Sequence, residues 1–247
     1  MLILANWKAY VGDLKKAREL VATAKRLRAA YKHEIVLAPP APFIGLLAVP
    51  NRSKVAFAAQ DISETTGGAA TGEIPASAYR SAGATYAIIG HSERRAQGES
   101  DAAIAEKLTR ALAHDLTPVL CVGERERDME GRYLSFVREQ ITSALSKLLP
   151  KERSRVILAY EPVWAIGKTA ADAISQSDLT EMVLYSRKVL AELLPGKSSL
   201  QSRVLYGGSV EPTNIRDLAG SSGVDGFLIG HASVDTLMFS KLVRELT

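Results

Sequence analysis

The sequence predicts an α/β protein whose eight parallel strands close into a (β/α)8 barrel. Short apolar runs recur along the chain, amphipathic segments of helical period separate them, and no change of composition or linker marks a domain boundary. Strands that are apolar throughout are typical of a parallel sheet covered on both faces. Barrels of this type are commonly about 250 residues long. We therefore expect residues 1–247 to form a single domain.

Each expected strand is a short apolar run bounded by Gly, Pro, Asn or charged residues. In chain order the eight runs are Leu2–Ala5, Ile35–Ala38, Val55–Ala59, Tyr86–Ile89, Pro118–Val122, Val156–Tyr160, Arg203–Tyr206 and Gly226–Ile229. Because a helical pattern follows each run, the chain is expected to form a closed (β/α)8 barrel.

The first helical pattern begins after Asp13, a residue type that caps helices, and ends near Tyr31. One face of it is apolar, as a helix packed on a sheet requires: Leu14, Ala17, Val21, Ala24 and Leu27. The later long patterns span Ser100–His114, Tyr133–Leu149, Ser177–Leu194 and Ser233–Leu246. Shorter helices are expected after Ile74, after Pro212 and within Pro39–Pro50.

The main structural alternative is an open, doubly wound sheet. That fold normally carries a glycine-rich G-x-G-x-x-G turn after its first strand. Asn6-Trp7-Lys8 stands there instead and contains no glycine. The same absence of a dinucleotide fingerprint leads us to expect no cofactor.

Composition narrows the classes of function and partner. The 31 basic and 27 acidic residues are intermixed and give a net charge of only +4, so we expect no nucleic-acid partner. No apolar run approaches the length of a membrane span, so no membrane partner is expected. A single cysteine, Cys121, excludes an internal disulfide and indicates the cytoplasm. We expect its thiol to be packed and unreactive.

Other titratable residues give little sign of chemistry. No spacing of His, Cys and Asp indicates a metal site, so none is expected. His33 and His114 lie near the ends of expected helices, and we expect both at the surface.

Polar residues at the carboxyl ends of the strands are the candidates for chemistry, because barrels place their active sites there. Glu161 follows the sixth strand, and Pro162 forces that strand to end. The loop after it contains Trp164 and is unusually apolar. A lone carboxylate under an apolar loop is typical of a general base shielded from water.

Two further side chains occupy strand ends. His91 follows the fourth strand at the start of an expected helix, where the neutral imidazole is favoured. A neutral imidazole can still donate a hydrogen bond to a carbonyl oxygen. Lys8 follows the first strand beside Asn6. A solvated surface lysine is the usual interpretation of such a residue, but its position directly after a buried strand would also let it neutralise a phosphorylated substrate.

Glycine-rich turns follow the last two strands. They read Gly207-Gly208-Ser209 and Gly230-His231. Glycine lets the backbone approach a ligand, and the helix that follows offers free N–H groups and a partial positive charge. Two such turns on adjacent strands predict a phosphate cradle, at the position where barrels often have one.

These motifs resemble the triosephosphate isomerase family over nearly the whole chain. Six of them follow the family's order: Ala5-Asn6-Trp7-Lys8, Thr71-Gly72-Glu73-Ile74, Ile89-Gly90-His91-Ser92-Glu93-Arg94-Arg95, Cys121-Val122-Gly123-Glu124, Ala159 to Gly167, and Tyr206-Gly207-Gly208-Ser209-Val210. The resemblance implies a TIM barrel that interconverts dihydroxyacetone phosphate and D-glyceraldehyde 3-phosphate through an enediolate. It also implies a place in glycolysis and gluconeogenesis.

The resemblance assigns roles to individual residues. Glu161 is the base that moves a proton between adjacent carbons, and His91 polarises the carbonyl and shuttles protons between oxygens. Lys8 supplies positive charge, Asn6 hydrogen-bonds the same oxygen region, and Glu93 supports Lys8. The residues implied in phosphate binding are Asn6, Lys8, Gly167, Gly207, Gly208, Ser209, Gly230 and His231.

The family also implies a lid and a dimer. The lid would consist of Pro162, Val163, Trp164, Ala165, Ile166, Gly167, Lys168, Thr169 and Ala170. It would exclude water and so prevent loss of phosphate from the enediolate. In a homodimer, the loop containing Thr71, Gly72 and Glu73 would insert near Asn6 and Lys8 of the partner subunit.

Three departures from the family pattern stand out. The lid lacks two residues between Gly167 and Lys168, His231 replaces a glycine, and Ala70 replaces a larger aromatic residue in the dimer loop. We interpret the first two as compensating, with His231 filling the gap or adding a hydrogen bond. The changes leave open an isomerase of a related tetrulose phosphate. A phosphate-binding barrel without catalysis is disfavoured, because Glu161, His91 and Lys8 are all present.

Overall fold

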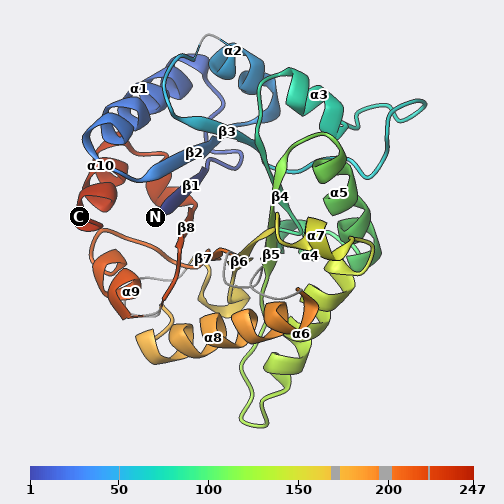
Figure 1. Ribbon diagram of the computed structural model, residues 1–247. Helices are drawn as coiled ribbons and strands as arrows, with labels where there is room; N and C mark the ends of the chain where they lie inside the picture. Colours follow the sequence, from blue (N-terminus) through green and yellow to red (C-terminus); the bar gives the residue numbers. More distant parts are fainter. Residues whose placement is uncertain (50, 168–172, 195–201, 222) are drawn as a thin grey trace.

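The computed structural model describes residues 1–49, 51–167, 173–194, 202–221 and 223–247. Over these residues, eight parallel strands pair in chain order and the last pairs with the first, which closes a barrel (Figure 1). The strands are β1 (Leu2–Asn6), β2 (Glu34–Ala38), β3 (Ala56–Ala59), β4 (Tyr86–Ile89), β5 (Thr117–Val122), β6 (Ile157–Tyr160), β7 (Val204–Tyr206) and β8 (Gly226–Ile229). The predicted (β/α)8 fold is therefore confirmed, and the strand limits differ from the prediction by one residue at most.

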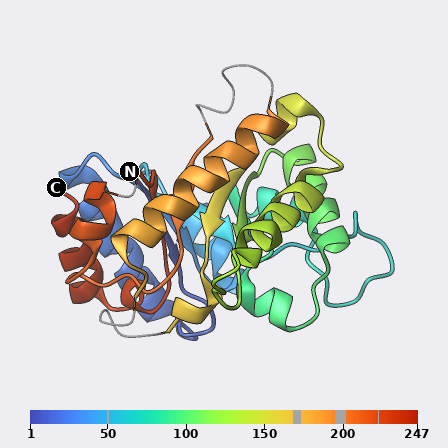
Figure 2. The same cartoon turned by 90° about the horizontal axis from the view of Figure 1, so that it is seen from below.

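Helices surround the barrel on all sides (Figures 1 and 2). The α-helices are α1 (Leu14–Ala30), α2 (Ile44–Ala48), α3 (Ala76–Ser81), α4 (Ser92–Ala96), α5 (Asp101–Ala113), α6 (Arg132–Leu145), α7 (Pro150–Arg153), α8 (Gln176–Leu193), α9 (Ile215–Ser221) and α10 (Thr236–Glu245). Short 3₁₀ turns are η1 (Ala41–Phe43), η2 (Val163–Ala165) and η5 (His231–Ser233).

Capping residues set where several helices begin. The Asp13 carboxylate accepts the N–H groups of Lys15 and Lys16 at 3.1 and 2.9 Å, as the sequence predicts for the start of α1. Ser100 caps α5 by accepting the Ala103 N–H at 3.2 Å. These caps satisfy backbone donors that have no partner within the helix.

Two helix predictions need correction. The helix expected over Tyr133–Leu149 ends at Leu145, and a separate short helix begins at Pro150, whose ring suits a first helical position. The helix expected from Ser233 begins at Thr236 instead. Asp235 caps it by accepting the N–H groups of Leu237 and Met238, and η5 precedes it.

Alternation along the strands divides the buried residues into two groups. Leu2 and Leu4 belong to the cluster inside the barrel, whereas Ile3 and Ala5 pack under the surrounding helices. Asn6 is in phase with Leu2 and Leu4. Glu161 is likewise in phase with Ile157 and Ala159, which are both inside. A period of two therefore aims both polar side chains at the barrel axis, just beyond the strand ends.

His33 does not lie at the surface as predicted. Only 9% of it is exposed. Burial, with help from the N-terminal ammonium group and Arg28, lowers the pKa of this histidine below its ordinary value. Its place after a helix did not reveal that β2 begins at the next residue, which buries His33 at the end of the barrel where the strands start.

The loop between β3 and α3 projects from the body of the molecule (teal in Figures 1 and 2). Thr71, Gly72 and Glu73 lie in it and are all exposed. Among the residues described, no helix has the length and apolar character needed to cross a membrane.

Candidate active site

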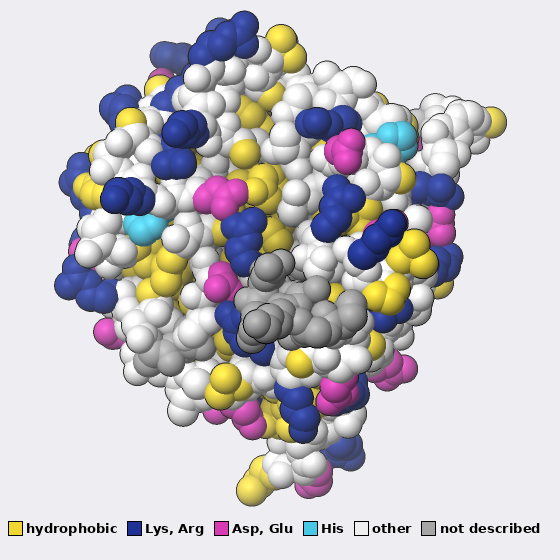
Figure 3. Space-filling model, in the orientation of Figure 1, with side chains coloured by type: hydrophobic (Ala, Val, Ile, Leu, Met, Phe, Trp, Pro, Cys, Tyr) yellow, Lys and Arg dark blue, Asp and Glu magenta, His cyan; other side chains and the backbone are white. Residues whose placement is uncertain are grey.

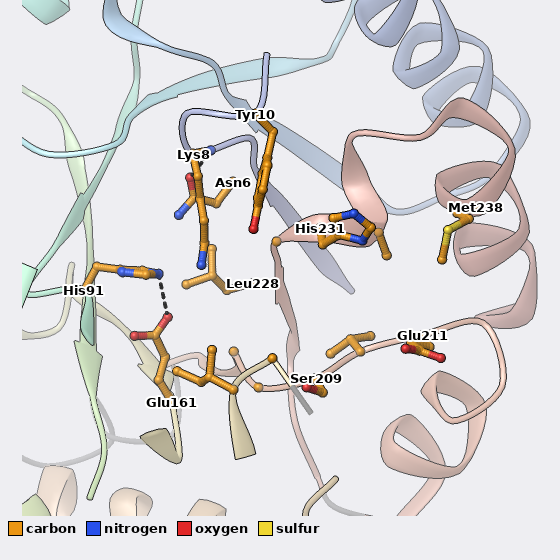
Figure 4. Close-up of a pocket in the computed structure, with 17 residues that line it drawn as sticks. Asn6, Lys8, Tyr10, His91, Glu161, Ser209, Glu211, Leu228, His231 and Met238 are labelled. Carbon is orange, nitrogen blue, oxygen red and sulfur yellow. Dashed lines mark hydrogen bonds and ion pairs between the residues drawn. The ribbon is translucent and has the colours of Figure 1, made fainter. Parts of the chain in front are cut away.

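A cavity of about 370 Å³ opens where the strands end. Side chains from the ends of β1, β4, β6, β7 and β8 converge on it (Figure 4). The predicted residues that line it are Asn6, Lys8, His91, Glu161, Gly167, Gly207, Gly208, Ser209, Gly230 and His231. Predicted residues from five separate segments of the chain are thus brought to one cavity.

Glu161 and His91 face each other across this cavity (Figure 4). The distance between Glu161 Oε1 and His91 Nε2 is 3.3 Å, and the Ser92 N–H donates to Glu161 Oε2 at 3.1 Å. The two side chains are almost fully buried, with Glu161 2% and His91 6% exposed. Electrostatic interactions in such a buried site are screened less than they would be in water.

The tautomer of His91 follows from its backbone contact. The Glu93 N–H donates to His91 Nδ1 at 3.2 Å, so Nδ1 carries a lone pair and Nε2 carries the proton. His91 caps α4 in this way. Gly90 makes the arrangement possible, because its φ of 72° turns the chain between β4 and α4. The Nε2–H group therefore points at the cavity as a hydrogen-bond donor.

Gly207 sets the position of the Glu161 side chain. A Cβ atom at residue 207 would lie 2.8 Å from Glu161 Cγ and 3.3 Å from its Oε1. The backbone is fixed as well, because the Gly207 N–H donates to the Tyr160 carbonyl at 2.8 Å. The end of β7 therefore leaves space that the carboxylate of Glu161 occupies.

Lys8 is held at both its backbone and its ammonium group. Its φ of 46° lies in the left-handed region, which is unusual for a lysine, and its N–H donates to Asn6 Oδ1 at 3.0 Å. Gln60 Nε2 donates to the Lys8 and Ala38 carbonyls, each at 2.9 Å. A strained backbone supported from two sides is characteristic of a functional position.

Glu93 lies against the Lys8 side chain, with Lys8 Nζ and Glu93 Oε1 2.6 Å apart. Partial burial acts to raise the pKa of Glu93, but the hydrogen bond from Lys8 and its charge outweigh burial and lower it. The carboxylate of Glu93 therefore stays ionised beside the Lys8 ammonium group.

The glycine-rich turns lie together at the other end of the cavity. A Cβ at Gly230 would lie 3.5 Å from Lys8 Cε, which shows how closely the β8 turn approaches Lys8. The Ser209 hydroxyl donates to the Ala165 carbonyl at 2.8 Å and so joins the β7 turn to the loop after β6. His231 begins η5 and is exposed.

The described part of the predicted lid runs from Pro162 to Gly167, and Ile166 and Gly167 line the cavity. Lys168, Thr169 and Ala170 lie outside the described residues, as does the site of the missing pair. Glu124 anchors the base of this segment: its buried Oε1 accepts the Tyr160 hydroxyl and the Trp164 indole N–H, both at 2.8 Å. Glu124 was given no role from the sequence, although a carboxylate directly after the expected strand Pro118–Val122 was a usable signal.

The remaining candidates for chemistry are a thiol and a metal site. Cys121 is buried, and desolvation together with the nearby Glu161 charge raises the pKa of its thiol, so it is a poor nucleophile. Within the described residues, no cluster of three or more His, Cys, Asp or Glu side chains is arranged to hold a metal ion.

Tyr10 also lines the cavity, although the sequence did not identify it as a site residue. It is 59% exposed and lies in a loop, and a lone tyrosine in a loop carries no pattern that indicates a function.

Fold and site together define a (β/α)8-barrel enzyme with a glutamate and a histidine side chain facing each other at the carboxyl ends of its strands. The family model described as triosephosphate isomerase matches residues 1–246. The chain belongs to the triosephosphate isomerase family.

Similar proteins cover nearly the full length of the chain. The triosephosphate isomerase of Moorella thermoacetica is 38% identical over 98% of this chain and 97% of its own length. The one from Roseiflexus sp. strain RS-1 is 40% identical over 99% and 97%. The one from Thermus thermophilus is 38% identical over 99% and 98%.

Proposed function

We propose that this enzyme interconverts dihydroxyacetone phosphate and D-glyceraldehyde 3-phosphate, a reaction of glycolysis and gluconeogenesis. The observation that carries the proposal is the buried pair of Glu161 and His91, with Oε1 and Nε2 3.3 Å apart at the cavity floor. A base and a hydrogen-bond donor on one cavity are what proton transfer next to a carbonyl requires.

In the proposed reaction, Glu161 removes a proton from the hydroxymethyl carbon of the ketose. The electron pair of that C–H bond forms a carbon–carbon double bond, and the carbonyl oxygen takes up negative charge. His91 Nε2–H stabilises this oxygen and moves protons between the two oxygens, while Lys8 adds positive charge. Protonated Glu161 then delivers its proton to the neighbouring carbon, which yields the aldose and restores the carboxylate.

We assign the phosphate group of the substrate to the other end of the cavity. Gly167, Gly207, Gly208, Ser209, Gly230 and His231 line the cavity together with Asn6 and Lys8. The glycine-rich turns would bind the phosphate through backbone N–H groups other than that of Gly207, which is bonded to the Tyr160 carbonyl. The loop from Pro162 to Ala170 is assigned as the lid. Glu124 would set its hinge, because it bonds both the end of β6 and Trp164.

The remaining assignments are also proposals. Residues 1–247 form one domain, since the barrel uses strands from both ends of the chain. The protein is a homodimer in which the exposed loop bearing Thr71, Gly72 and Glu73 reaches the partner's site. A buried, unpaired Cys121 supports a cytoplasmic location. We propose no nucleic-acid partner, because Lys and Arg are interspersed with acidic side chains on the face in Figure 3.

The decisive experiment is a coupled isomerase assay of the wild type and Glu161→Gln. A positioned base typically contributes roughly 10²–10⁴-fold, so kcat should fall by about that factor. Glu19→Gln, the same change on the exposed face of α1, is the control and should leave kcat unaltered. Full activity of Glu161→Gln would refute the mechanism. Faster turnover of a four-carbon ketose phosphate than of the triose would refute the substrate assignment.

His231 is proposed to bind the substrate rather than to assist the chemical step. Replacing it by glycine removes a ring from the cavity wall but keeps the backbone N–H. We therefore expect His231→Gly to raise KM roughly fivefold to tenfold, an effect typical of one lost polar contact, with a smaller change in kcat. Steady-state kinetics in both directions measure this, and an unchanged KM would contradict it.

A further inference from the structure

We propose that Tyr10 is a further substrate-binding residue, whose hydroxyl donates a hydrogen bond to the phosphate group and whose ring is held in place by His231. This inference rests on the proposed function, because it concerns the phosphate end of the same cavity. It assigns a side chain to binding where the glycine-rich turns supply mainly backbone.

The loop after β1 places Tyr10 at the cavity. Its N–H donates to the Trp7 carbonyl at 3.1 Å, which closes a turn around the left-handed Lys8. Tyr10 is 59% exposed, yet it lines the cavity and directs its hydroxyl into it (Figure 4). Packing in the core therefore does not explain the position of this large ring.

His231 fixes the orientation of the tyrosine. The ring centroids are 5.6 Å apart and the ring planes meet at 81°, an edge-to-face arrangement. This geometry is the favoured one for aromatic pairs and stabilises them beyond the burial of area. Strand pairing explains how the rings meet, because β8 lies beside β1 with Ile229 opposite Ala5. The two loops that carry the rings leave adjacent strands.

The polar groups at this end of the cavity leave a role for the tyrosine. The Ser209 hydroxyl already donates to the Ala165 carbonyl. Among the described residues, no hydrogen bond uses the Tyr10 hydroxyl or the His231 ring nitrogens as donors. A phenol O–H directed at a phosphate oxygen makes a charge-assisted hydrogen bond, which is stronger than a neutral one. A ring with only two rotatable bonds, already held by His231, loses little entropy on binding.

A subunit contact is the competing explanation for the exposure of Tyr10, since the proposed dimer brings the partner's loop near this mouth. The two explanations differ in what they predict for Tyr10→Phe. Loss of a ligand contact weakens phosphate binding and leaves the oligomeric state unchanged. Loss of a subunit contact alters the oligomeric state, which mass photometry measures directly.

The test compares wild type, Tyr10→Phe and the control Tyr31→Phe, which removes a hydroxyl at the end of α1, away from the cavity. Calorimetry with inorganic phosphate gives Kd without relying on catalysis, and the isomerase assay gives KM and kcat. We expect Tyr10→Phe to raise both Kd and KM by roughly tenfold and to change kcat by much less, from the loss of one hydrogen bond to a charged group. Tyr31→Phe should match the wild type.

Coupling to His231 is tested by His231→Ala alone and combined with Tyr10→Phe. If His231 holds the ring, the increase in phosphate Kd of the double variant should be smaller than the product of the increases in the two single variants. Unchanged phosphate Kd and KM in Tyr10→Phe, or a dimer that dissociates in this variant, would overturn the proposal. Absence of isomerase activity in the wild type would instead overturn the proposed function, while the phosphate titration still decides the role of Tyr10.

Discussion

Gly207→Ala tests whether the space beside Glu161 sets the position of the base. The new Cβ would lie 2.8 Å from Glu161 Cγ, 3.3 Å from Oε1 and 3.5 Å from Cδ. Non-bonded carbon atoms prefer about 3.5–4.0 Å, so the side chain of Glu161 must retreat by roughly 1 Å. The backbone of residue 207 cannot yield easily, because its N–H is bonded to the Tyr160 carbonyl.

A displacement of about 1 Å in a catalytic group can cost on the order of 10²-fold in rate. We therefore expect kcat of Gly207→Ala to fall by roughly 10- to 100-fold, with a smaller change in KM. The coupled isomerase assay measures both constants, and urea unfolding shows whether the fold is retained.

Gly220→Ala in α9 is the matched control, because a Cβ there meets nothing within 4 Å. It should keep the wild-type kcat. If Gly207→Ala remained within about threefold of the wild-type kcat while its fold was intact, the argument that this glycine positions the base would be wrong.

Two further predictions concern stability. The folded state lowers the pKa of His33 below the unfolded value near 6.5, so the neutral histidine contributes fully to the free energy of unfolding above pH 6.5. This contribution declines as the pH falls below that value, by at most about 1.4 kcal/mol per pH unit. Urea unfolding between pH 7.5 and 5.5 should show a shallower decline for His33→Gln than for the wild type, and an equal decline would contradict this. Trp164→Phe removes a donor from the buried Glu124 carboxylate and should lower the free energy of unfolding by about 1–3 kcal/mol. The same substitution in a Glu124→Leu background should cost clearly less.

Much of the barrel was predictable because its signals are local. Apolar runs of the right length identify the strands, and caps such as Asp13 and Ser100 identify helix starts. Prediction failed where a tertiary environment decides. His33 follows a helix end, and it is buried only because it lies at the end of the barrel where the strands start. The break between α6 and α7 depended on Pro150, which suits a helix start as well as a helix end.

For the cavity, the sequence identified individual residues better than the contacts between them. Their position at strand ends identified Asn6 and Glu161 from the chain itself, and both line the cavity. Lys8 and Glu93 are far apart in the sequence, and their contact was expected only from the family resemblance. Tyr10 and His231 could not be paired in this way, because neither the alternation of a strand nor a shared motif connects them.

Closure of the barrel explains why Tyr10 and His231 meet. In an open sheet with the same strand order, β1 and β8 would be opposite edges, and residues near the two ends of the chain would stay apart. Pairing of β8 with β1 instead brings the β8 turn against Lys8 and the ring of His231 against Tyr10. A substitution in one turn is therefore expected to change the side-chain positions in the other. Because the rings of Tyr10 and His231 pack edge to face, we propose that these two positions be changed together when this end of the cavity is redesigned.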